Sequence, residues 1–219
     1  MSQPKGTSKS SNSDGLKLTV PTVTYAQTLR RLQVIQNHLS LPRQGRLKDK
    51  VCIITGVGSL KGIGRATALL FAHQGAKALY LLDFDGTNLP NLKETIEKSY
   101  PDVHVAVIEG DAADDATISN LVSRALSEQG RLDVFFANAG VASGKPSITA
   151  ISDDEWDQMM HINTTSCFLA VKYAAPAMMK TSLEGGTPKE DSNGSILLTA
   201  SVAGLRSGAG PIHCKSSRF

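Results

Sequence analysis

The 219-residue sequence has few cysteines, no long apolar run and almost no net charge. Its three cysteines, Cys52, Cys167 and Cys214, are widely spaced and odd in number, so they indicate neither a metal site nor a disulfide framework. This cysteine usage is typical of a reducing compartment and favours a cytoplasmic location. The formal net charge of +3 gives no reason to expect nucleic acid or an anionic membrane as a partner.

No apolar run approaches the roughly 18 residues that a membrane-spanning helix needs, so we expect no membrane insertion. Hydrophobic residues make up 41% of the chain and charged residues 20%, which is typical of a globular protein. The length is sufficient for one α/β domain with a sizeable core.

Residues 1–46 differ from the rest in charge. Asp14 is their only acid, against the basic residues Lys5, Lys9, Lys17, Arg30, Arg31, Arg43 and Arg46. The segment begins rich in Ser and Lys, which predicts disorder. Helical spacing follows, in the apolar residues Tyr25, Leu29, Leu32, Ile35 and Leu39. We therefore expect a disordered basic tail plus a short amphipathic helix. A mitochondrial transit peptide, and with it a mitochondrial location, is the alternative.

From residue 50 onwards, short apolar runs alternate with segments of helical periodicity. The runs predict strands at 51–55, 78–82, 103–108, 133–137 and 195–200, and the periodic segments predict helices at 63–74, 89–100 and 115–129. Ser152 and Glu155 form a capping box that opens a further helix, and a helical pattern resumes near Asn163 and runs to about Lys180.

This alternation predicts an α/β fold: a doubly wound parallel sheet with helices on both faces. The full dinucleotide-binding version of this fold has six strands in the spatial order 3-2-1-4-5-6. The sequence supplies five, so we expect the last strand to be lacking and the fifth strand to leave an apolar edge unpaired.

A glycine-rich turn, GVGSLKGIG from Gly56 to Gly64, follows the first predicted strand. Glycines allow a sharp turn and let a pyrophosphate approach the amides at a helix N-terminus. Asp83 ends the second predicted strand, nineteen residues beyond Gly64, where a carboxylate can bind an adenosine ribose. The context favours a dinucleotide site over a plain glycine-rich loop.

Asp83 and Lys61 favour different cofactors. A carboxylate at the end of the second strand would bind the ribose diol of NAD and repel the 2′-phosphate of NADP. Lys61, a cation within the turn, could instead pair with that phosphate. We give Asp83 more weight and expect NAD, with NADP as the less favoured cofactor.

Over about Leu47 to His213 the sequence resembles the short-chain dehydrogenase/reductase family, which has a Rossmann-type fold. The family's Thr-Gly-x-x-x-Gly-x-Gly turn is similar to the segment ending Gly62-Ile63-Gly64, with Thr55-Gly56 displaced by a two-residue insertion. The segment from Ala137 to Gly140 is similar to the family's Asn-Asn-Ala-Gly. The turn and the resemblance together imply cofactor contacts at Gly56, Gly58, Lys61, Gly62, Ile63, Gly64, Asp83, Asp111, Ala112, Asn138, Ala139 and Gly140.

The resemblance also implies a catalytic site. Asn163 matches the helix Asn of the family's catalytic tetrad, and Ser201 matches its Ser after the fifth strand. The family completes this tetrad with Tyr-x-x-x-Lys, in which the Lys ammonium shifts the pKa of the phenol towards the operating pH. Cys214 stands in the Tyr position and Arg218 in the Lys position. Neither replacement keeps the geometry of the original side chain.

These observations leave three functions open. The first is an oxidoreductase that transfers hydride between NAD(H) and a small-molecule alcohol or ketone, active at least in a longer form of the chain. The second is an inactive dinucleotide-binding fragment or pseudo-enzyme, favoured by Cys214 and Arg218. The third is a thiol enzyme based on Cys214, with His213 as its only nearby base.

The resemblance implies that a full-length form would be a homo-oligomer. We also expect residues 47–219 to form one NAD(P)-binding domain that is incomplete at its C-terminus. The simplest account is a changed reading frame, from a retained intron, alternative splicing or a gene-model error.

Overall fold

The structure, a computed structural model, describes residues 42–142, 148–180 and 193–205, together with Arg30, Gln33 and Asn37. Contacts divide the chain into two units, Met1–Leu41 and Pro42–Phe219. In the first unit the three described residues are helical and exposed, and the rest of the expected tail and helix lies outside the described residues. No helix in the described part of the chain is long and apolar enough to cross a membrane.

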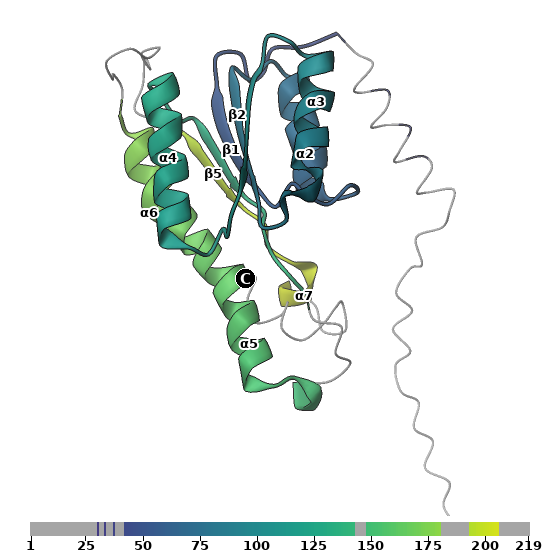
Figure 1. The fold of residues 1–219 in the computed structure, drawn as a ribbon, viewed down its shortest axis with the longest axis vertical. Helices are drawn as coiled ribbons and strands as arrows, with labels where there is room; N and C mark the ends of the chain where they lie inside the picture. Colours follow the sequence, from purple (N-terminus) through teal and green to yellow (C-terminus); the bar gives the residue numbers. More distant parts are fainter. Residues whose placement is uncertain are drawn as a thin grey trace, which may run out of the picture. The chain divides into compact units, whose positions relative to one another are not determined.

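The second unit is built on a five-stranded parallel sheet (Figure 1). Its strands are β1 (Val51–Thr55), β2 (Ala78–Asp83), β3 (His104–Glu109), β4 (Val134–Ala137) and β5 (Ser195–Leu198). Their spatial order is β3-β2-β1-β4-β5, and every pairing is parallel. The predicted doubly wound order is therefore confirmed for five strands.

Within the described residues β5 pairs only with β4. Its side chains Leu197 and Leu198 are 43% and 49% exposed. The apolar outer edge that the sequence predicts for the fifth strand is thus present in the described part of the fold.

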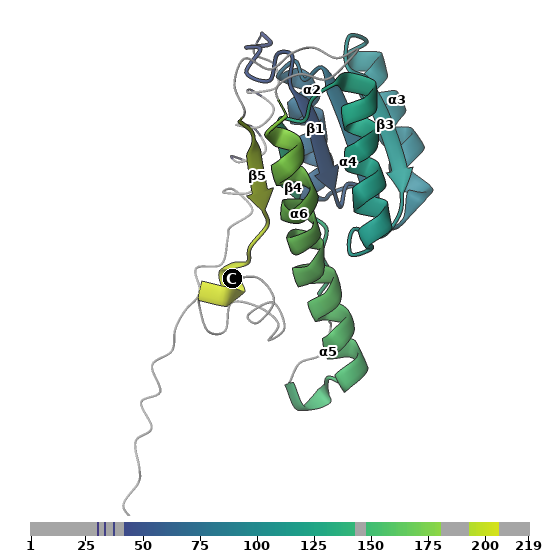
Figure 2. The same cartoon turned by 90° about the vertical axis from the view of Figure 1, so that its left-hand side faces the viewer.

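Helices cover both faces of the sheet, as predicted (Figures 1 and 2). α2 (Ile63–His73) and α3 (Leu89–Ser99) lie on one face, and α4 (Asp115–Gln129) and α6 (Ser166–Met178) lie on the other. The described elements also include three short helices: η1 (Gly86–Asn88) precedes α3, η2 (Ile148–Ala150) follows β4, and α7 (Val202–Leu205) follows β5.

Local sequence signals explain where several helices begin and end. The Asp114 side chain accepts a hydrogen bond from the Thr117 amide at the start of α4, and the helix ends at Gly130, whose φ of 73° is left-handed. At the start of α5 (Asp153–Met160), Ser152 and Glu155 form the predicted capping box in both directions.

The expected break before Asn163 is wrong. α5 continues into η3 (His161–Thr165), one turn of π-helix, and then directly into α6. The three elements form a single rod that extends beyond the carboxyl edge of the sheet (Figure 2). A π-turn takes an extra residue, so it shifts the phase of the apolar stripe and imitates an interruption in the sequence pattern.

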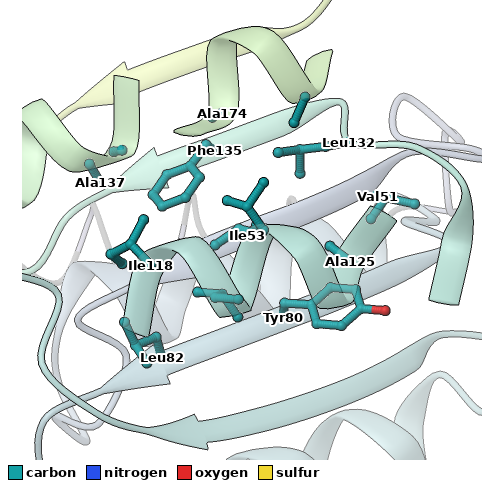
Figure 3. Close-up of a cluster of buried hydrophobic side chains, with 14 of the residues drawn as sticks. Val51, Ile53, Tyr80, Leu82, Ile118, Ala125, Leu132, Phe135, Ala137 and Ala174 are labelled. Carbon is teal, nitrogen blue, oxygen red and sulfur yellow. The ribbon is translucent and has the colours of Figure 1, made fainter. Parts of the chain in front are cut away.

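Two hydrophobic clusters fill the layers on either side of the sheet. Alternate residues of β1 enter them: Val51 and Ile53 face α4 and α6, whereas Cys52 and Ile54 face α2 and α3. Figure 3 shows the first cluster, in which Phe135 lies close to Ile53 over the central strands. Because β1 is completely buried on both faces, the position of its carboxyl end is fixed by packing.

Candidate cofactor site at the carboxyl edge of the sheet

A cavity of about 790 Å³ opens where the parallel strands end. It lies at the point where the strand order reverses between β1 and β4, which is where open α/β sheets bind their ligands. Its lining comes from the end of β2, from the segments that follow all five strands, and from α5 and η3: Gly56, Gly58, Ser59, Gly62, Ile63, Leu82, Asp83, Phe84, Asp85, Asn88, Asp111, Ala112, Asn138, Ala139, Gly140, Val141, Gln158, His161, Ile162 and Thr199.

The glycine-rich turn fits tightly against the segment after β4. Gly56 has a φ of 74°, and a Cβ there would lie 2.7 Å from the Cα of Ala139. A Cβ at Gly64 would overlap the carbonyl oxygen of Gly56. The turn therefore requires glycine at both positions, which lets α2 begin directly behind it.

The beginning of α2 is suited to an anion. Its N-cap, Gly62, has no side-chain cap bond, and its first turn has no acidic residue. Gly62 and Ile63 both line the cavity. The first turn of α2 and the positive end of its dipole thus lie beside the cavity, an arrangement that favours a phosphate.

Asp83 lies at the end of β2 with its carboxylate held by backbone amides. The Gly58 amide donates to Oδ2 at 2.6 Å, and the Asp85 amide donates to Oδ1 at 3.0 Å. A carboxylate oxygen can accept more than one hydrogen bond, so both oxygens keep capacity for ligand hydroxyls.

Carboxylates dominate the charge of the cavity. Asp83, Asp85 and Asp111 line it, and its described lining includes no Lys or Arg. Hydrogen bonds from the side chain and the backbone of Thr87 hold the pKa of the Asp85 carboxyl below its usual value, so this group is anionic at neutral pH. Asp111 accepts a hydrogen bond from the Ala113 amide at 2.8 Å.

Asn138 connects the ends of three strands beneath the cavity. Its Nδ2 donates to the carbonyl oxygens of Thr55 at 3.3 Å and Gly56 at 3.0 Å, and its Oδ1 accepts from the Thr199 hydroxyl at 3.1 Å. The Thr55 hydroxyl in turn accepts from the amides of Asn138 and Ala139, both at 3.1 Å. Asn138 thereby ties β1, β4 and β5 together.

Asn163 is 1% exposed and is not part of the cavity lining. Its side chain binds the backbone of Val141 twice: Oδ1 accepts from the amide at 2.9 Å and Nδ2 donates to the carbonyl at 3.0 Å. The π-turn that carries Asn163 thus anchors the chain that leaves β4, and this anchor holds Gly140 and Val141 at the cavity.

Of the other predicted catalytic residues, the structure describes only Ser201. The Ser201 hydroxyl accepts a hydrogen bond from the Ala203 amide at 3.2 Å and caps α7, and Ser201 is absent from the described lining. Cys214 and Arg218 lie outside the described residues, as does His213.

Most of the predicted cofactor residues do meet at the cavity. Two of them do not line it: Lys61 is exposed on the turn, and Gly64 is buried beneath Gly56. Gly56, Gly58, Gly62, Ile63, Asp83, Asp111, Ala112, Asn138, Ala139 and Gly140 all line it.

Sequence reasoning missed several lining residues. Thr199 is the first residue after β5 and could have been found, because the carboxyl ends of parallel strands meet at one edge. Gln158 and His161 also line the cavity, three residues apart on the α5–η3 rod. They do so because the rod passes the carboxyl edge of the sheet, and the local sequence does not specify where the rod lies. The described residues contain no cluster of side chains suited to a metal ion.

A doubly wound parallel sheet with a glycine turn at its switch point defines a dinucleotide-binding class of α/β protein. A sequence model of the short chain dehydrogenase family matches residues 50–219. The chain belongs to this family.

Individual relatives agree with that assignment. Levodione reductase from Leifsonia aquatica is 33% identical over 161 residues, which cover 74% of this chain and 55% of the relative. The crystal structure of levodione reductase superposes with a TM-score of 0.68 at 31% identity, over 78% of this chain and 62% of that one. The chain thus spans little more than half the length of such relatives.

Two similar crystal structures contain a nicotinamide dinucleotide. NAD⁺-bound xylitol dehydrogenase has a TM-score of 0.68 and 25% identity, over 79% of this chain and 61% of that chain. Carveol dehydrogenase from Mycobacterium avium in complex with NAD has a TM-score of 0.65 and 27% identity, over 80% of this chain and 62% of that chain.

Proposed function

We propose that this protein is an NAD(H)-dependent oxidoreductase that acts on a small-molecule alcohol or ketone. The observation that carries the proposal is the close fit of the glycine-rich turn. Gly56 and Gly64 leave no room for a Cβ, and residues at the start of α2 line the cavity beside them. The residues present therefore fit a pyrophosphate. NAD in two similar structures supports the choice of cofactor.

Each part of the site has a separate task in this proposal. The first turn of α2 holds the pyrophosphate, and Asp83 accepts hydrogen bonds from the adenosine ribose. Ala139 and Gly140 line the cavity and follow Asn138 in the chain. NAD, when bound, accepts or supplies the hydride.

The chemistry on the substrate belongs to the polar residues after β5. We assign the Ser201 hydroxyl to the substrate oxygen: its Oγ accepts a hydrogen bond from the Ala203 amide, and a hydroxyl that accepts one hydrogen bond can still donate its own proton. Asn163 acts as a positioning residue through Val141. Cys214 and Arg218 stand where the family has its Tyr and Lys, and binding without turnover is therefore the second candidate function.

The test uses the purified 219-residue chain. Its single tryptophan, Trp156 on α5, precedes the lining residue Gln158 by two positions, so NADH binding should quench its fluorescence and sensitise the NADH emission. NAD⁺-dependent oxidation of an alcohol panel is then followed by NADH absorbance. Saturable binding with turnover supports the first function, binding without turnover supports the second, and no binding contradicts both.

Asp83→Asn tests the ribose contact without changing side-chain size. Hydrogen bonds to charged groups contribute about 1.5–3 kcal/mol, so the Kd for NADH should rise roughly tenfold or more. Glu94→Gln, which neutralises an exposed carboxylate on α3, is the matched control and should leave the Kd unchanged. An unchanged Kd in Asp83→Asn would remove Asp83 from the site.

A further inference from the structure

Gly58 and Asp83 are 25 residues apart in the sequence and in direct contact at the cavity. The Gly58 amide donates to Asp83 Oδ2 at 2.6 Å, and a Cβ on Gly58 would lie 2.8 Å from the Asp83 Cγ. The Asp85 amide holds the other carboxylate oxygen. The turn after β1 therefore packs directly on the Asp83 carboxylate and fixes its orientation.

Asn88 holds Gly58 from its other side. Its Nδ2 donates to the Gly58 carbonyl oxygen at 3.0 Å. Asn88 occupies the N-cap position of α3, where an Asn side chain ordinarily accepts a hydrogen bond from the first turn, yet it makes no cap bond there. The side chain is thus directed away from the helix and onto the glycine-rich turn.

These three residues, Gly58, Asp83 and Asn88, form what we call the Gly58 clamp. All three line the cavity. Removing the side-chain amide of Asn88 would take away the hydrogen bond to the Gly58 carbonyl oxygen. The glycine-rich turn would then be free to move away from Asp83. The carboxylate would then lose its short hydrogen bond and could rotate.

We propose that Asn88 is a positioning residue for cofactor selectivity: acting through Gly58, it holds Asp83 ready for the ribose diol and closes the space beside it to a 2′-phosphate. This inference rests on the proposed NAD(H) function. A carboxylate already oriented by two amides loses little freedom when ribose binds, which favours NAD.

The surrounding charge acts in the same direction. A 2′-phosphate brings about −1.5 to −2 charges, and it would meet the anionic Asp85 as well as Asp83. The described lining supplies no Lys or Arg to compensate it. Lys61 is exposed on the turn and does not belong to the described lining.

The experiment compares the dissociation constants of NADH and NADPH for the unmodified chain and for Asn88→Ala. In the variant the Kd for NADH should rise about three- to tenfold, the effect of one hydrogen bond, while the Kd for NADPH stays the same or falls. The selectivity ratio therefore drops. A purely structural role would weaken both cofactors equally, and that result would overturn the inference.

Gly58→Ala tests the same clamp from the opposite element. Its new Cβ would displace the Asp83 carboxylate, so it should lower the selectivity ratio as Asn88→Ala does, with thermal unfolding confirming that both variants are folded. Asn120→Ala, at an exposed position of α4, is the control and should leave both constants unchanged.

The outcomes separate the two proposals. If the unmodified chain binds neither cofactor, the proposed function fails and the inference fails with it. If the unmodified chain prefers NADH and both clamp variants keep that preference, only the inference fails. Partial recovery of selectivity in Asn88→Ser, which restores a shorter donor, would support the positioning role.

Discussion

Replacing Asn138 by alanine should destabilise the whole carboxyl edge of the sheet. The side chain makes three hydrogen bonds, to Thr55, Gly56 and Thr199, at 3.3, 3.0 and 3.1 Å. A neutral hydrogen bond contributes about 1 kcal/mol net, and the longest of these contributes less. We therefore expect Asn138→Ala to lower the free energy of unfolding by about 2–3 kcal/mol.

Thr199→Val isolates one of the three bonds. It removes the hydroxyl and keeps the shape, so it should cost about 1 kcal/mol. Because Thr199 donates to Asn138, the two changes are coupled, and the double variant should be about 1 kcal/mol more stable than the sum of the single effects predicts.

The assay is urea unfolding of each variant, followed by circular dichroism, with the slope m compared between variants. Asn120→Ala on the exposed face of α4 serves as the control and should change stability by less than about 0.5 kcal/mol. A loss in Asn138→Ala no larger than that of Thr199→Val would refute the assignment of Asn138 as the link between the strands. So would strict additivity in the double variant.

Three further predictions concern the turn, an ion pair and a thiol. Gly64→Ala should abolish NADH binding and lower the melting temperature, since its Cβ would overlap the Gly56 carbonyl; retained binding would contradict the close fit. Arg124 donates to Glu128 and holds the pKa of that carboxyl below its usual value, so this contribution to stability is present above the ordinary Glu pKa of about 4.3 and is lost as pH falls through the lower folded value. Glu128→Gln should accordingly flatten the acid limb of a stability–pH curve, and an unchanged limb would count against the pair. Burial raises the pKa of the Cys52 thiol, so pulse alkylation with peptide mapping should label Cys52 only after unfolding, and labelling of the native chain would show that this strand opens.

Much of the fold follows from the sequence because its signals are local. A run such as Val51–Thr55 is apolar at every position, which indicates a strand buried on both faces, and the structure buries all of it. Gly130 ends α4 and Ser152 opens α5 for reasons contained within a few residues. The π-turn at His161–Thr165 could not be predicted in this way. Its extra residue shifts the apolar periodicity, and this shift has the same appearance in a sequence as a break between two helices.

Some residues of the candidate site can likewise be located from the sequence, and others cannot. Gly56 and Asp83 both line the cavity, as expected for residues at the carboxyl ends of neighbouring strands in a parallel sheet; their contact with a cofactor stays a prediction. The position of Lys61 in the turn predicts a cofactor contact, whereas the structure shows Lys61 exposed and outside the described lining. The direction of a side chain on a turn depends on what the turn packs against, and the sequence does not state it.

The sequence by itself determined the alternation of strands and helices, the glycine turn and the acid at the end of β2, since each depends on periodicity or on backbone sterics within a short segment. Only the tertiary structure decided that Asn138 reaches Thr55, 83 residues away, and that Asn88 holds Gly58 across 30 residues. Such contacts depend on strand order and register, which place the ends of distant segments together at one edge of the sheet.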